Sequence, residues 1–160
     1  MPIVPVIRNA TPADVPAILA MVAELAEFEK LTHLLDMSEQ RLHDDLFGAR
    51  PVIYAVVAEV DSGVQAFALY FENYSTFLTR RGLYLEDLYV RPALRGQGLG
   101  KTLLKHLAKI AYERGYGRFD WSVLDWNANA ISFYQSLGAD VLPDWRICRV
   151  TGDALARLAS

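Results

Sequence analysis

Three glycines at alternate positions, Gly96, Gly98 and Gly100, mark the segment of this sequence that is best suited to bind a ligand. The segment follows a β-type stretch that ends at Val90, and an amphipathic helical pattern begins at Leu99. Glycines let the backbone turn tightly and approach a bound group, and the first N–H groups of a helix have no partner inside it. Such a strand–turn–helix binds phosphate groups, so the sequence predicts an anion site here.

Spacing argues against two phosphate-binding interpretations of this turn. A Walker loop also ends in Gly-Lys-Thr, as residues 100–102 do, but it needs a glycine where this chain has Arg95. A dinucleotide fingerprint needs its third glycine one residue later and a loop after the first strand, although Asp120 lies at a suitable distance to imitate its ribose-binding acid. A third possibility is that the glycines only form a sharp corner between strand and helix.

The elements that position this turn follow from hydrophobic periodicity and from turn residues. Thr11 begins one predicted helix and Ser38 caps a second, and residues 61–63 predict an antiparallel hairpin. The other predicted helices cover residues 99–114 and 128–137, with a short helical tail after residue 151. The predicted strands cover residues 4–8, 52–60, 65–74, 83–90, 118–124 and 145–150. This order predicts a mixed sheet of the α/β or α+β type, in a single domain over residues 1–160.

Composition limits the partners of the chain. It has 160 residues, a net charge of −3 and a pI near 5.6, with no basic stripe, so we expect no nucleic acid partner. No apolar run approaches the roughly 20 residues that span a bilayer, so we expect no membrane partner and a cytoplasmic location. Cys148 is the single cysteine, and the three histidines lie far apart, so neither a disulfide nor a metal site is expected.

Several motifs resemble the GNAT superfamily of N-acetyltransferases. They are Arg-Gly-x-Gly-x-Gly after a Leu-Tyr-Val strand, Tyr-Leu-Glu-Asp at residues 84–87, and Asp-Trp-Asn at residues 125–127 followed by Phe-Tyr at 133–134. The last two resemble the diamine branch, that of spermidine/spermine N1-acetyltransferase. The resemblance implies the GNAT fold, with an antiparallel N-terminal half, splayed central strands and a βαβα C-terminal half.

The resemblance also implies that acetyl-coenzyme A is the cofactor. The strand residues that would pair with its pantetheine arm are Leu88, Tyr89 and Val90. The residues of the turn that would hold its pyrophosphate are Arg95, Gly96, Gln97, Gly98, Leu99, Gly100 and Lys101. Asn127 and Tyr134 complete this cofactor-binding set, although Asn127 is equally a residue that caps helices.

Acetyl transfer requires a neutral amine, and an alkylammonium has a pKa near that of lysine, about 10.4. Glu86 is the predicted general base, directly or through one water, unless it is an ordinary strand carboxylate that faces solvent. Tyr134 is the predicted acid for the leaving thiolate, unless it only packs between helix and sheet. Asn127 is the third residue of the predicted catalytic set, and a main-chain N–H near Leu88 is the implied oxyanion donor.

The predicted substrate site combines carboxylates with aromatic faces. Its members are Glu29, Glu86, Asp87, Trp126 and Trp145. The alternatives are that Asp87 is a structural acid facing a loop and that the tryptophans only pack. Alternation along a strand places Glu86 and Asp87 on opposite faces, so both can reach one cleft only if the strand carries a bulge. The stretch between Gly138 and Trp145 is shorter than in the mammalian polyamine enzymes, which leaves the identity of the amine open.

The leading hypothesis is an acetyl-coenzyme A-dependent N-acetyltransferase for a small diamine, polyamine or lysine-like amine. One alternative keeps the chemistry with another acceptor, such as an aminoglycoside, an amino acid or a protein lysine. Another is a non-catalytic acyl-coenzyme A-binding module. The resemblance also implies a homodimer. The final strand and the aromatic residues Tyr74 and Phe77 are candidates for its interface, unless they are internal.

Overall fold

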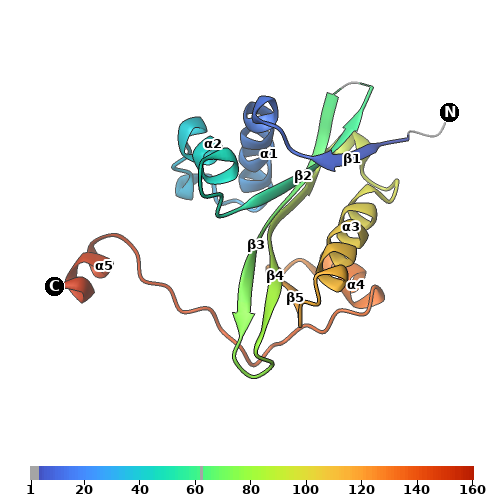
Figure 1. Ribbon diagram of the computed structural model, residues 1–160. Helices are drawn as coiled ribbons and strands as arrows, with labels where there is room; N and C mark the ends of the chain where they lie inside the picture. Colours follow the sequence, from blue (N-terminus) through green and yellow to red (C-terminus); the bar gives the residue numbers. More distant parts are fainter. Residues whose placement is uncertain (1–3, 62) are drawn as a thin grey trace. The chain divides into compact units, whose positions relative to one another are not determined.

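The computed structural model describes residues 4–61 and 63–160, so Ser62 of the predicted hairpin turn lies outside the described residues. Contacts divide the chain into two compact units, the first ending at Ser122 and the second covering residues 123–160. The first unit holds the sheet, and the second holds two helices (Figure 1).

The sheet of the first unit has its strands in sequence order, β1 to β5. The strands are β1 (Val6–Asn9), β2 (Tyr54–Val60), β3 (Gly63–Ser75), β4 (Arg80–Val90) and β5 (Phe119–Trp121). Neighbours are antiparallel from β1 to β4, and β5 pairs in parallel with β4. A parallel neighbour requires a crossover, and helix α3 (Leu99–Glu113) supplies it. The mixed sheet with an antiparallel first half is therefore confirmed.

Helices cover both faces of this sheet (Figure 1). On one face, α1 (Val15–Phe28) and α2 (Glu39–Phe47) form the core with alternate residues of β2, β3 and β4. The intervening strand residues, such as Val56 and Ala68, point to the opposite face of the sheet and are also buried. Helix α3 packs on that opposite face with Leu103 and Leu107. A strand buried on both faces has no polar alternation, which explains the continuous apolar runs of β2 and β3.

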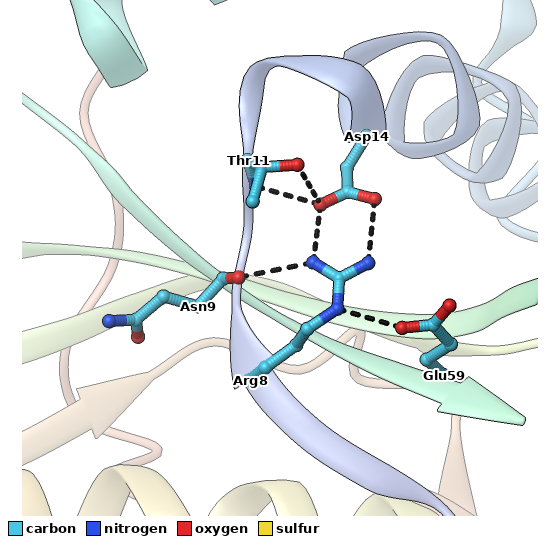
Figure 2. Close-up of polar contacts among 5 residues, drawn as sticks. All are labelled: Arg8, Asn9, Thr11, Asp14 and Glu59. Carbon is cyan, nitrogen blue, oxygen red and sulfur yellow. Dashed lines mark hydrogen bonds and ion pairs between the residues drawn. The ribbon is translucent and has the colours of Figure 1, made fainter.

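The start of α1 is fixed by a partly buried ion pair (Figure 2). Arg8 of β1 donates from both terminal nitrogens to Asp14 at 2.7 and 3.0 Å and from Nε to Glu59 of β2 at 2.9 Å. Asp14 ends a short 3₁₀ helix (Pro12–Asp14), and it accepts from the N–H and hydroxyl of Thr11. The hydrogen bonds from Arg8 hold the pKa of Asp14 below its usual range, although burial opposes this. The predicted helix start at Thr11 is thus confirmed.

Two further 3₁₀ helices complete the first unit, Thr32–Leu34 and Pro92–Leu94. Ser38 caps α2 as predicted, since its hydroxyl accepts from the N–H of Arg41 at 3.2 Å. Among the helices of the described residues, none is long and apolar enough to cross a membrane.

The second unit contains α4 (Ala128–Ser136) and α5 (Gly152–Ala159), both close to the predicted bounds. The predicted strand at residues 145–150 is wrong, because this segment forms no strand within the described part of the chain. Its aromatic and β-branched residues Trp145, Ile147 and Val150 give β propensity, but a strand also needs hydrogen bonds from a neighbour. Trp145 and Ile147 accordingly remain 80% and 73% exposed.

Candidate active site

The glycine-rich turn has the backbone that its sequence predicts. Gly96 and Gly98 have φ angles of 78° and 79°, in the left-handed region that favours glycine, and Gly98 is the N-cap of α3. Gly100 lies in the first turn of α3, where an added Cβ would meet only a methyl group of Val90, at 3.9 Å. The turn therefore presents main chain, with little side-chain bulk, to any group that approaches it.

The N–H groups of this turn have no backbone acceptor from residue 96 to residue 101 among the described residues. The first amide of α3 with an acceptor is that of Thr102, which donates to the Gly98 carbonyl at 3.0 Å. Arg95 differs from its neighbours, because its N–H donates to the Pro92 carbonyl at 3.2 Å. The free donors and the positive end of the helix dipole together suit an anion at this turn.

The strand that leads into this turn leaves one edge open. β4 pairs with β5 only at residues 83–85, and residues 87–90 pair only with β3 within the first unit. Leu88, Tyr89 and Val90 lie in this open part, next to the turn. Backbone groups on an unpaired strand edge can bind an extended ligand as a further strand would.

A β-bulge places the two carboxylates of β4. Asp87 pairs with Leu69 and Leu85 pairs with Tyr70, so Glu86 is the extra residue. Since side chains alternate with a period of two, one inserted residue turns Asp87 to the face that carries Tyr89 and α1. Glu86 itself is exposed on the bulge. The bulge that the sequence analysis required is confirmed.

Asp87 belongs to an acidic cluster with Glu86 and Glu29. Burial, followed by the negative charges of Glu86 and Glu29, raises the pKa of Asp87 to about 6. Glu29 is the C-cap of α1, and burial also raises its pKa. A concentrated negative charge of this kind attracts an ammonium group, and a bound cation would favour the ionised form of Asp87.

Asp87 should make the stability of the protein depend on pH. Because the pKa of Asp87 is higher in the folded protein than in the unfolded chain, the free energy of unfolding is highest below pH 4, where Asp87 is protonated in both states. The free energy of unfolding then falls as the pH rises through about 6. One pKa unit corresponds to about 1.4 kcal/mol, so two units correspond to about 3 kcal/mol, less some screening by solvent. We expect Asp87→Asn to be more stable than the parent at pH 7.5 by about 1 to 3 kcal/mol and similar to it at pH 4.

Urea unfolding at the two pH values measures this difference. Glu27→Gln, which removes an exposed carboxylate from the last turn of α1, is the control and should behave like the parent at both pH values. If Asp87→Asn gives no pH-dependent difference, Asp87 has an ordinary pKa in the folded protein.

The structure also shows contacts that the sequence analysis missed. The guanidinium of Arg95 lies 5.4 Å from the ring centroid of Tyr89 and 5.6 Å from that of Phe28 on α1. Tyr89 and Arg91 both donate to Glu24 of α1, each at 3.2 Å. Glu24 and Phe28 are four residues apart, as are Arg91 and Arg95. The spacing of Glu24 and Phe28 indicates that they share one face of α1, but only the tertiary structure shows which residues contact that face.

The second unit holds the other predicted site residues. Asn127 is the N-cap of α4, and its Oδ1 accepts from the N–H of Ala130 at 3.2 Å, so its capping role is confirmed. Tyr134 is half-buried on α4, with its ring 5.6 Å from that of Phe133. Trp126 and Trp145 are both more than half exposed. In the described residues, no group of three or more His, Cys, Asp or Glu side chains is arranged to hold a metal ion.

Comparison with known proteins identifies the family. The model of the acetyltransferase (GNAT) family matches residues 19–139. The chain is 42% identical to the thialysine N-epsilon-acetyltransferase of Mus musculus, over 96% of each chain. It is 37% identical to an L-ornithine N5-acetyltransferase of Arabidopsis thaliana, over 93% of this chain and 85% of the other.

A solved structure agrees with these sequence matches. An integron cassette protein from the mobile metagenome of V. cholerae is 28% identical, with a TM-score of 0.79 over 99% of this chain and 98% of the other. The family model covers more than half of the chain, including the turn, the bulge and α4. The chain therefore belongs to the GNAT family, and it is an N-acetyltransferase.

Proposed function

We propose that this protein transfers an acetyl group from acetyl-coenzyme A to a terminal primary amine of a small diamine, polyamine or lysine-like substrate. The observation that supports this most directly is the acidic cluster of Glu29, Glu86 and Asp87, which surrounds the bulge on the strand leading into the anion-binding turn. The names of two relatives agree, because they place the acetyl group on Nε of thialysine and on N5 of ornithine.

Acetyl-coenzyme A supplies an activated thioester when it is bound. The N–H groups of residues 96–101 would hold its pyrophosphate, because the described part of the chain gives them no backbone acceptor, and Lys101 adds a positive charge. Leu88, Tyr89 and Val90 would hold the pantetheine arm along the open edge of β4, with Asn127 and Tyr134 of the second unit as further contacts. A main-chain N–H near Leu88 would donate to the acetyl carbonyl oxygen.

On the amine side, the roles of the carboxylates follow from their surroundings. Asp87 and Glu29 would attract the positive groups of the substrate, because they lie in a partly desolvated cluster where a charge interaction is strong. Glu86, exposed on the bulge, would take the proton of the reacting ammonium, directly or through one water. Trp126 and Trp145 would offer aromatic faces to the aliphatic and cationic parts.

An acetyl-transfer assay with a panel of amines tests this function. Release of the coenzyme A thiol is followed with spermidine, 1,3-diaminopropane, L-lysine, L-ornithine and thialysine, and with glycine and an aminoglycoside as contrasts. We expect turnover with at least one of the first five and none with glycine, which has no distal amine.

Each other outcome points to a different function. Turnover only with an aminoglycoside or a protein lysine would replace the substrate class and keep the chemistry. Calorimetric binding of coenzyme A without turnover on any amine would indicate a binding module. Absence of coenzyme A binding would contradict the assignment of the turn.

We also propose that the protein is a cytoplasmic homodimer. Trp145, Ile147 and Val150 in the segment after α4 are exposed, as are the hairpin residues Tyr74 and Phe77, and such apolar side chains are typical of an interface. The absence of nucleic acid and membrane partners stays a prediction from the composition. Sedimentation equilibrium measures the oligomeric state.

A further inference from the structure

Arg95 links the cofactor turn to α1. It lies in the turn, yet its side chain does not extend away from the protein as that of a free phosphate ligand would. Its Nε donates to the Val90 carbonyl at 2.9 Å, and its guanidinium lies within cation–π distance of the rings of Tyr89 and Phe28. These three contacts direct the exposed Arg95 side chain toward the end of β4 and the last residue of α1.

The contact between Arg95 and Phe28 lies next to the acidic cluster. Phe28 is the last residue of α1, and the next residue is Glu29, whose negative charge acts on Asp87. One turn earlier on α1, Glu24 accepts hydrogen bonds from Tyr89 and Arg91. Two contacts, at Glu24 and at Phe28, therefore hold the helix against the end of β4. Arg95 makes the second of these contacts, at Phe28, which is next to Glu29 of the acidic cluster.

We propose that Arg95 is a positioning residue whose side chain holds the end of α1 against β4 and thereby sets the affinity for the amine. This inference rests on the proposed function, because it concerns the same acidic cluster. It differs from the role that the family resemblance implies for this arginine, which is to hold the cofactor pyrophosphate. The proposed pyrophosphate site needs only the N–H groups of residues 96–101, which have no backbone acceptor among the described residues.

The test compares Arg95→Met with the parent, using two acetyl donors. One donor is acetyl-coenzyme A, and the other is S-acetylpantetheine, which has the same thioester but no pyrophosphate. The assay uses whichever amine the parent acetylates best, so a failure of the proposed function appears in the parent before any variant is made. We expect the KM for the amine to rise about tenfold with both donors, with kcat within threefold and the donor KM within twofold of the parent.

Three further variants separate positioning from general damage. Phe28→Leu removes the ring and should reproduce the rise in amine KM, whereas Arg95→Lys keeps a cation and should restore part of the affinity. Lys105→Met removes an exposed positive charge from α3 and should leave every constant unchanged. Combining Arg95→Met with Glu29→Gln should raise the amine KM no further than the larger single effect, because both act on one contact chain.

Two results would overturn the inference. The first is a rise in the donor KM of Arg95→Met with acetyl-coenzyme A that disappears with S-acetylpantetheine, since this is the behaviour of a pyrophosphate ligand. The second is an unchanged amine KM in both Arg95→Met and Phe28→Leu. If Arg95→Met does not fold, as judged by thermal unfolding, the amine KM values of Phe28→Leu and Arg95→Lys decide the question.

Discussion

Replacing Glu86 by glutamine should lower kcat/KM for the amine at pH 7 by at least about a hundredfold, which is the lower part of the range for general acid–base catalysis. Glutamine has the shape of glutamate but cannot take a proton. From pH 7 to pH 9 the neutral fraction of an amine with a pKa of about 10.4 rises roughly a hundredfold, so the variant should regain part of its activity at high pH. The bulge makes this role physically accessible, because it leaves Glu86 exposed beside the open edge of β4.

The measurement is a pH profile of kcat/KM for the parent, Glu86→Gln and the control Glu27→Gln. Glu27 is an exposed carboxylate on α1, so its loss tests whether removal of any exposed negative charge has the same effect. A profile of Glu86→Gln that is parallel to that of the parent would exclude Glu86 as the base.

Asp87→Asn in the same series distinguishes the base from its neighbour. With a pKa of about 6, Asp87 is ionised at neutral pH, and we assign it to attraction of the substrate. Its loss should therefore raise the KM for the amine more than it lowers kcat. If Asp87→Asn instead shows the activity loss and the alkaline recovery expected for Glu86→Gln, the two carboxylates exchange roles.

Replacing Tyr134 by phenylalanine should lower kcat about a hundredfold and leave the KM for acetyl-coenzyme A within twofold, because the change removes one hydroxyl and keeps the ring. A thiolate leaves more readily when a nearby acid protonates it, and the phenol of Tyr134 is the proposed acid. The ring contact with Phe133, at 5.6 Å between centroids, does not depend on the hydroxyl. This ring contact should therefore be kept in the variant.

Tyr112→Phe is the matched control, because it removes a hydroxyl from an exposed tyrosine on α3. Steady-state kinetics of both variants, with coenzyme A binding by calorimetry, give kcat and cofactor affinity separately. Full activity of Tyr134→Phe would remove the phenol from the mechanism. Equal losses in both variants would mean that the assay detects a general effect of the substitution.

Local rules in the sequence predicted most of the elements and the turn correctly. Gly96 and Gly98 are needed because their φ angles are positive, and the N-caps Ser38 and Asn127 accept from nearby amides. These features depend on interactions within a few residues, so the sequence carries them directly. The prediction of a strand at residues 145–150 was wrong for the opposite reason, because strand pairing depends on residues far away in the chain.

The candidate site shows the same division between local and tertiary determinants. The order of Glu86 and Asp87 on one strand required a bulge, but only the register with Leu69 and Tyr70 decided which residue is the extra one. Likewise, the sequence placed Arg95 in the turn, and the tertiary structure directed its side chain toward Phe28. The sequence alone thus determined the turn, the helix caps and the residue types of the site. The tertiary structure decided the desolvation of Asp87 and the contacts of Arg95, because burial and charge proximity arise only when α1 and β4 pack together.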